Sequence, residues 1–265
     1  MLRSLSALAV LACLVAGCSG AGSNVPTSPQ SAYERGKTAY DEGKYLRAIE
    51  SLQSVFDFGR AHEYAADAQY FLGKAYYEDG QFLLAANDFD RFSQLYPTDA
   101  RVEEAQFLRA MSYYNLSPRY ELDQTDTERA INYLRLFASR YPASERVPEI
   151  GRRIDQLQEK LARKLFEGAM LYERQEQFEP AALTYERVLA KYPNTSYADD
   201  AMVAAMRAYI AYADISIEAK REERLDKAIS IYDRLVQIFP DSPLLKEAEA
   251  QYDAAQNRKS AVAQG

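Results

Sequence analysis

The residues that could carry out catalysis in this chain are few, and their spacing does not assemble a site. His62 is the only histidine among 265 residues, so a Ser–His–Asp or Cys–His system would have to use it. The zinc-protease pattern fails at His62-Glu63, because Ala66 occupies the place of the second histidine. We therefore expect His62 to be a surface residue of a turn, and the protein not to be an enzyme.

Carboxylates that lie close together in the sequence do not indicate an acid–base pair either. They are Asp88 and Asp90, Asp199 and Asp200, and Glu222 and Glu223. Residues one or two places apart do not share a helix face, so we expect solvated surface charges. The sequence has no glycine-rich phosphate loop and no basic stripe, and 39 acidic against 32 basic residues favour solubility. No metal, cofactor or nucleic acid is expected.

Residues 1–17 have the pattern of an export signal. Arg3 is followed by the apolar run 5–15, which is shorter than the ~20 residues that a membrane-spanning helix needs. Residues 18–31 contain mainly Gly, Ser, Pro, Asn and Thr, and we expect a flexible tether there. Fully extended, such a tether would reach roughly 40 Å.

The signal ends in Leu14-Val15-Ala16-Gly17-Cys18, which resembles the bacterial lipobox. The resemblance implies that cleavage leaves Cys18 as the first residue, with an N-acyl chain such as palmitate and an S-diacylglycerol group. The alternative is an ordinary secretory signal with a coincidental cysteine. Ser19 follows instead of Asp, which by the sorting rules of enteric bacteria favours the outer membrane. Cys13 would leave with the signal, so no thiol would remain for a disulfide, a zinc site or a nucleophile.

A short pattern recurs four times after the tether. An aromatic residue followed by proline occurs at Tyr96-Pro97, Tyr141-Pro142, Tyr192-Pro193 and Phe239-Pro240. An alanine lies twelve residues before each proline, and a large apolar or tyrosine side chain lies eight residues before it. Because proline cannot continue a helix, each proline marks the end of the second helix of a hairpin. The alanine would let the two helices approach closely.

The first helices of the hairpins carry a second pattern. Equivalent positions are Gly36, Gly73, Ala110, Ala169 and Met206. Successive members are 37, 37, 59 and 37 residues apart, and the longer interval leaves room for an 8-residue loop and a 14-residue helical extension. A further insertion of ten residues lies around Ser216–Arg224. The pattern resembles the tetratricopeptide repeat, although Arg60 replaces the proline of the first unit.

The predicted fold is all-α: a right-handed superhelical array of five tetratricopeptide-like hairpins plus a C-terminal capping helix. Ser242-Pro243 is expected to cap and begin that last helix. The expected divisions are a lipoprotein signal peptide (1–17), the lipidated cysteine and tether (18–31), repeats one to three (32–145), a linking helix with repeats four and five (146–241), and the capping helix with its tail (242–265).

Stacked hairpins line their concave side with first helices, and three positions of each first helix should face inward. In the first three units these positions are Tyr33, Lys37 and Tyr40; Tyr70, Lys74 and Tyr77; and Phe107, Met111 and Tyr114. In units four and five they are Phe166, Met170 and Glu173, and Val203, Arg207 and Ile210. Aromatic rings with ammonium groups suit an extended peptide that carries aromatic side chains, so the first three sets are the predicted partner-binding residues. The alternative is that these rings only pack between helices.

The chain resembles the BamD family of lipoproteins of the outer-membrane β-barrel assembly (BAM) machine. The best-matched stretches are Leu84–Pro97, which contains Asp90-Arg91-Phe92, and Leu116–Ala130, which contains Ser117-Pro118 and Leu122-Asp123-Gln124. The long linking helix after Pro142 also fits.

The resemblance implies a periplasm-facing adaptor, lipid-anchored in the outer membrane, for folding and membrane insertion of β-barrel proteins. The N-terminal repeats would bind C-terminal targeting signals of unfolded outer-membrane proteins. The C-terminal repeats would dock on the periplasmic domains of the barrel insertase and on accessory lipoproteins. An alternative is a repeat lipoprotein that serves pilus secretin assembly or a cell-envelope division complex. A glycan-capturing lipoprotein is disfavoured, because such proteins are rich in Trp and this chain has none.

Overall fold

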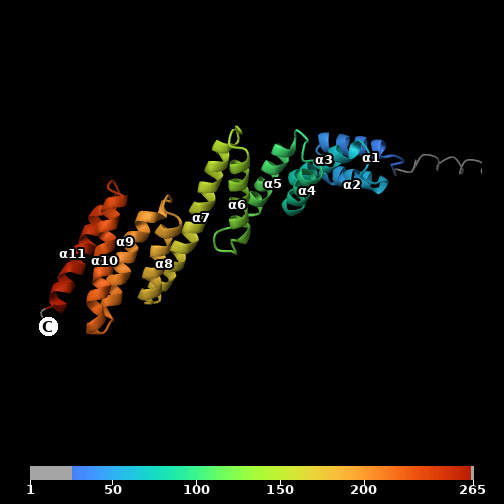
Figure 1. Cartoon of the computed structure of the whole chain (residues 1–265). Helices are drawn as coiled ribbons and strands as arrows, with labels where there is room; N and C mark the ends of the chain where they lie inside the picture. Colours follow the sequence, from blue (N-terminus) through green and yellow to red (C-terminus); the bar gives the residue numbers. More distant parts are fainter. Residues whose placement is uncertain (1–25, 264–265) are drawn as a thin grey trace, which may run out of the picture. The chain divides into compact units, whose positions relative to one another are not determined.

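A computed structural model of the chain describes residues 26–263. Within them it contains eleven α-helices, one short 3-10 helix and no strand, which confirms the all-α prediction (Figure 1). The predicted signal peptide and Cys18 lie outside the described residues. No helix in the described part is long and apolar enough to cross a membrane. The helices are α1 (Pro29–Asp41), α2 (Tyr45–Ser54), η1 (Val55–Phe58), α3 (Tyr64–Glu78), α4 (Phe82–Leu95), α5 (Val102–Leu116), α6 (Thr125–Arg140), α7 (Val147–Arg174), α8 (Phe178–Lys191), α9 (Tyr197–Asp214), α10 (Glu218–Ile238) and α11 (Leu245–Val262).

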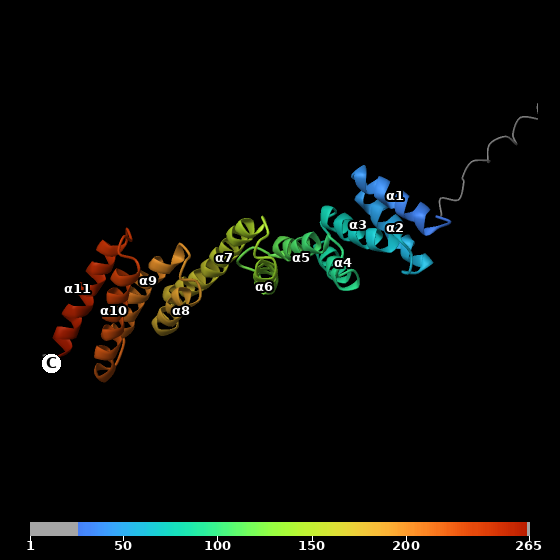
Figure 2. The same cartoon turned by 45° about the horizontal axis from the view of Figure 1, so that its top comes forward.

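The helices form the five predicted hairpins. Consecutive helices pair as α1–α2, α3–α4, α5–α6, α7–α8 and α9–α10, and α11 packs on α10 and α9 as the predicted capping helix. Turning the molecule keeps α9, α10 and α11 side by side (Figure 2). The alanines twelve residues before the prolines (Ala85, Ala130, Ala181 and Ala228) are completely buried.

Each aromatic–proline pair ends its helix for a physical reason. The aromatic residue is the first one beyond the helix, with φ and ψ of −127° and 57° at Tyr96 and −126° and 62° at Phe239. Proline excludes the helical conformation from the residue before it, which forces this exit. In the first hairpin, where Arg60 replaces the proline, α2 runs into η1 and the chain leaves at Gly59 with a positive φ of 91°.

The hairpins are tight where the sequence has its glycines. A Cβ atom at Gly36 would lie 2.6 Å from Cγ of Leu52, and one at Gly73 would lie 2.9 Å from Cε1 of Phe89. Both distances are shorter than any normal carbon contact. The first two hairpins therefore need glycine at these positions, whereas the later ones use Ala or Met.

Two predicted boundaries differ from the structure. The first helix begins at Pro29, because the side chain of Ser28 caps it by accepting a hydrogen bond from the backbone N–H of Ser31. Residues 29–31 thus belong to α1 and not to the tether. The capping helix begins at Leu245, not at Pro243. The insertion at Ser216–Arg224 is mostly helical and forms the first turns of the 21-residue helix α10.

The two insertions of the 59-residue interval appear within the third hairpin and in the helix that follows it, as predicted. Eight residues separate α5 from α6, and α7 is extended to 28 residues. α7 packs on α6 and also on α8 and α9. The chain divides into two compact units between Tyr96 and Pro97, and within the second unit α7 joins repeat three to repeats four and five.

A polar network in the N-terminal unit includes Asp88, which the sequence predicted to be a solvated surface charge. The guanidinium of Arg60 donates to Gln69 (3.0 Å), and the amide of Gln69, which is completely buried, donates to Asp88 (2.6 Å). Asp88 is therefore only partly exposed, and the prediction of a surface carboxylate was wrong for it. Burial raises the pKa of Asp88, and the Gln69 amide and the charges of Arg91 and Arg60 offset only part of this effect.

Replacing Asp88→Asn should change how stability depends on pH. A raised pKa in the folded state gives a contribution to stability that is complete below the ordinary pKa of a carboxyl group and is lost as pH rises through the raised value. We therefore expect the variant to unfold at a higher urea concentration than the natural protein at pH 7 and at a similar one near pH 4. A variant that is less stable at both pH values would show that the carboxylate stabilises the unit.

Candidate functional site

The predicted partner-binding residues of the first two repeats meet around a residue that the prediction did not include. The ring of Phe71 on α3 lies 5.5 Å from that of Tyr40 and 6.5 Å from that of Tyr33, both on α1. The ammonium group of Lys37 lies 4.9 Å from the centre of the Phe71 ring. We call Tyr33, Lys37, Tyr40, Phe71 and Lys74 the aromatic cluster; all five are partly exposed.

The two lysines of the aromatic cluster hold their charges over rings. Lys74 lies 5.8 Å from the ring of Tyr40 and 5.6 Å from the ring of Tyr70. Lys37 also forms an ion pair with Asp41 one turn along α1 (2.5 Å). Ammonium groups over aromatic faces are stabilised by the ring quadrupole, at about 0.5–1 kcal/mol each at exposed sites. The cluster therefore presents rings and positive charge together on one compact unit.

Tyr70 and Met111 are buried, whereas residues that line a binding groove should be accessible. Tyr70 is 4% exposed and packs its ring 5.4 Å from Phe92 of α4, and Met111 is 6% exposed. Both are core residues, so the prediction that they line an accessible groove was wrong. The side chain one place after Tyr70, Phe71, takes the outer position instead. Tyr77 remains partly exposed, with its ring 5.5 Å from that of Phe82.

In the third repeat, the predicted residues face other helices of their own unit. Phe107 packs edge-on against Phe137 of α6 (5.8 Å) and lies under the guanidinium of Arg146 (4.7 Å). Tyr114 is held by α7, because Arg153 lies 4.8 Å from its ring and donates to its hydroxyl (3.2 Å). The rings of Phe107 and Tyr114 thus make many of their contacts with other helices, as the alternative interpretation of packing between helices predicts.

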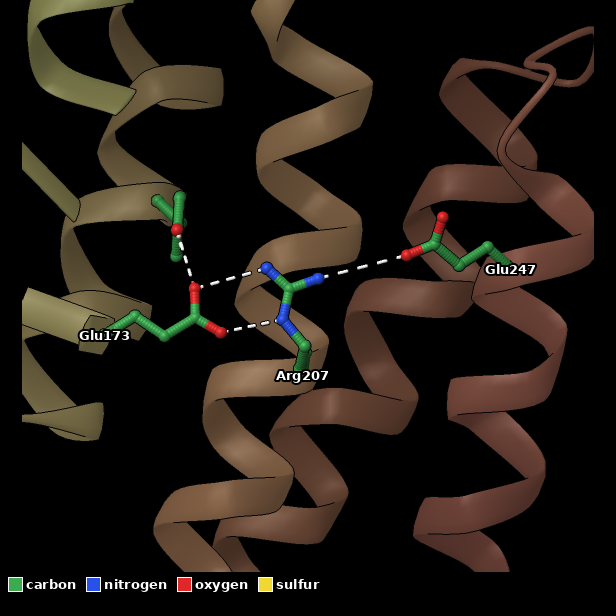
Figure 3. Close-up of polar contacts among 4 residues, drawn as sticks. Glu173, Arg207 and Glu247 are labelled. Atoms are coloured by element: carbon green, nitrogen blue, oxygen red, sulfur yellow. Dashed lines mark hydrogen bonds and ion pairs between the residues drawn. The ribbon is translucent and has the colours of Figure 1, made fainter. Parts of the chain in front are cut away.

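In repeats four and five, the inward positions form an ionic network (Figure 3). Arg207 on α9 donates two hydrogen bonds to Glu173 on α7 (2.7 and 3.2 Å), and it lies 3.9 Å from Glu247 on α11. The hydroxyl of Tyr185 donates to Glu173 as well (2.8 Å). Burial alone would raise the pKa of Glu173, but the bonds from Arg207 and Tyr185 outweigh it and lower this pKa.

His62 lies in the predicted turn but is not a simple surface residue. Its Nε2 lies 3.3 Å from the carbonyl oxygen of Val55 and 3.2 Å from that of Gly59. Its Nδ1 is buried and has no hydrogen-bond partner among the described residues. Residues 26–263 contain no group of three or more His, Cys, Asp or Glu side chains placed to hold a metal ion.

Comparison with known proteins identifies a family to which most of the chain is similar. A family described as "Outer membrane lipoprotein" (YfiO) matches residues 26–225. The chain belongs to the YfiO family. Among its relatives is the outer membrane protein assembly factor BamD of Caulobacter vibrioides, 28% identical over 81% of this chain and 72% of that protein. The BamD of Vibrio cholerae is 26% identical over 90% of this chain and 98% of that protein.

The similarity to the BamD family that the sequence motifs indicated is therefore confirmed. Among solved structures, a tetratricopeptide-repeat protein of Bacteroides fragilis is 13% identical, with a TM-score of 0.46 over 88% of this chain and 100% of that one. The YfiO match reaches residue 225, so it includes Glu173, Arg207 and the aromatic cluster but neither most of α10 nor α11.

Replacing Arg207→Met should destabilise the C-terminal unit by about 1–3 kcal/mol, because a partly buried Glu173 would keep only the Tyr185 hydroxyl. Glu173 has a lowered pKa, so the loss should be full above the ordinary pKa of a carboxyl group and should shrink as pH falls through the lowered value. Urea denaturation at pH 7 and pH 4 measures both effects. The matched control is Arg187→Met, an exposed arginine of α8. Equal stability of the two variants at pH 7 would contradict the prediction.

Proposed function

We propose that this chain is an adaptor of the β-barrel assembly machine, anchored at the periplasmic face of the outer membrane by the acylated Cys18. It binds targeting signals of unfolded outer-membrane proteins and docks on the barrel insertase and its accessory lipoproteins. Membership of the YfiO family, with BamD relatives that span most of the chain, is the observation that supports this function most strongly.

The aromatic cluster supports signal binding by the N-terminal unit. Tyr33, Tyr40 and Phe71 supply rigid rings from two helices, and Lys37 and Lys74 supply positive charge within 6 Å of them. Such a surface suits an extended peptide with aromatic side chains and a terminal carboxylate. Contacts of this exposed kind are individually weak, which fits an adaptor that must release its client.

The function is tested by capture from an envelope extract with the full acylated chain. We expect the β-barrel insertase and its accessory lipoproteins to be retained. A chain whose Cys18 is replaced by Ser serves as the control for anchoring, and it should leave the outer-membrane fraction. Retention of a pilus secretin or of a division protein in place of the insertase would overturn the proposal.

Replacing Tyr40→Ala should weaken binding of a peptide from the C-terminus of an outer-membrane β-barrel protein. The expected loss is about 1 kcal/mol, or roughly fivefold in Kd, with the helical content unchanged. Phe71→Ala should act in the same direction, since its ring joins α1 to α3. The matched control is Tyr172→Ala, an exposed tyrosine of α7 outside the cluster. If Tyr40→Ala binds like the control, the cluster serves packing alone.

A further inference from the structure

The eight-residue loop between α5 and α6 is fixed to α7 by two lysines one helical turn apart. The ammonium group of Lys160 donates to the hydroxyl of Ser117 (2.7 Å) and the carbonyl of Pro118 (3.0 Å). The ammonium group of Lys164 donates to three successive carbonyls, of which that of Leu122 is nearest (2.7 Å). These bonds satisfy backbone oxygens that a loop would otherwise leave to water.

The loop is also held by hydrogen bonds among its own residues and the first turn of α6. The buried amide of Gln124 donates to the carbonyls of Arg119 (2.8 Å) and Leu122 (2.9 Å). Its oxygen accepts a bond from Thr127 (2.8 Å), whose hydroxyl lies 2.5 Å from that of Ser117. A loop held at this many points presents its outer side chains in a set geometry, which lowers the entropy lost when they bind a partner.

Beside this loop lies an open depression of about 520 Å³ within the C-terminal unit. It is lined by Arg119, Tyr120, Glu121, Glu159, Lys160, Arg163 and Tyr197. The guanidinium of Arg163 stacks 4.1 Å from the centre of the Tyr120 ring. The ring of Tyr197 packs against that of Phe166, with the ring centres 5.4 Å apart. Two supported rings and three cationic groups thus meet at one surface.

The depression is lined by three cationic side chains and by two carboxylates, those of Glu121 and Glu159. Glu159 is engaged at the start of α9, where its carboxylate accepts bonds from the backbone N–H (3.1 Å) and the hydroxyl of Ser196. Among residues 26–263, the one carboxylate that pairs with Arg163 is that of Glu167, at 3.9 Å. The side chain of Arg119 makes no hydrogen bond or ion pair with any described residue. Arg119 and Arg163 are therefore available to an added carboxylate, which guanidinium groups bind with two parallel bonds.

We propose that this depression, the loop pocket, binds an acidic segment of a partner protein in which a carboxylate side chain lies next to an aromatic one. The carboxylate pairs with Arg119 and Arg163, and the aromatic ring packs on Tyr120 or Tyr197. The two rings and the volume favour a peptide segment over a small free anion, which would use the charges alone. This site is separate from the aromatic cluster, lies in the other compact unit and does not depend on the proposed function.

The test uses the full chain and a fluorescein-labelled hexapeptide that contains two aspartates flanking one phenylalanine. Fluorescence anisotropy should show saturable binding that weakens as salt is raised. Arg163→Gln should weaken it about tenfold, the effect of one lost charge-assisted contact. The matched control is Arg152→Gln, an exposed arginine of α7 that does not line the pocket, and it should bind like the natural chain.

A second peptide, with asparagines in place of the aspartates, should bind at least tenfold more weakly than the acidic one. Equal binding of the two peptides, no saturable binding, or equal losses in Arg152→Gln and Arg163→Gln would each overturn the proposal. Circular dichroism checks that each variant keeps its helical content. If Arg163→Gln unfolds, Arg119→Gln tests the same contact from the exposed loop, where substitution leaves the helices untouched.

Discussion

The close approach of the two helices in each hairpin is the constraint on which this structure depends. It needs a side chain no larger than a methyl group at one point of the second helix, and Ala85, Ala130, Ala181 and Ala228 meet that need without any exposure to solvent. In the first two hairpins the opposing helix also has a glycine, Gly36 or Gly73, against which a large side chain of the second helix packs. Once these points are set, the prolines fix where the second helices of hairpins two to five end.

Much of the fold could be predicted because this constraint repeats. A spacing of 37 residues between equivalent positions, and of twelve between alanine and proline, leaves little choice but five hairpins. The same arithmetic located the eight-residue loop and the long α7. The helix ends were predicted less accurately, because they depend on local hydrogen bonds that the spacing of residues does not reveal. One example is the bond from the Ser31 N–H to the side chain of Ser28.

The side chains of the candidate site were predicted less well. The prediction placed Tyr70 and Met111 in a groove, yet both are buried, and the ring of Phe92 packs against that of Tyr70. Phe71 was missed because it falls between the positions that the repeat pattern marks. Asp88 was predicted to be a solvated charge, but in the structure it accepts a hydrogen bond from Gln69, which in turn accepts one from Arg60. These outcomes depend on contacts between helices, and a single sequence carries no direct signal of them.

The continuity of α7 has a mechanical consequence. Its 28 residues span about 42 Å as one unbroken rod, in which Arg153, the residue that bonds to Tyr114, lies in the second turn and Glu173 lies in the last turn. A rod of this length acts as a lever: a tilt of 10° at one end displaces the other by roughly 7 Å. A tilt of α7 at the third repeat would therefore also displace Glu173, the hydrogen-bond partner of Arg207.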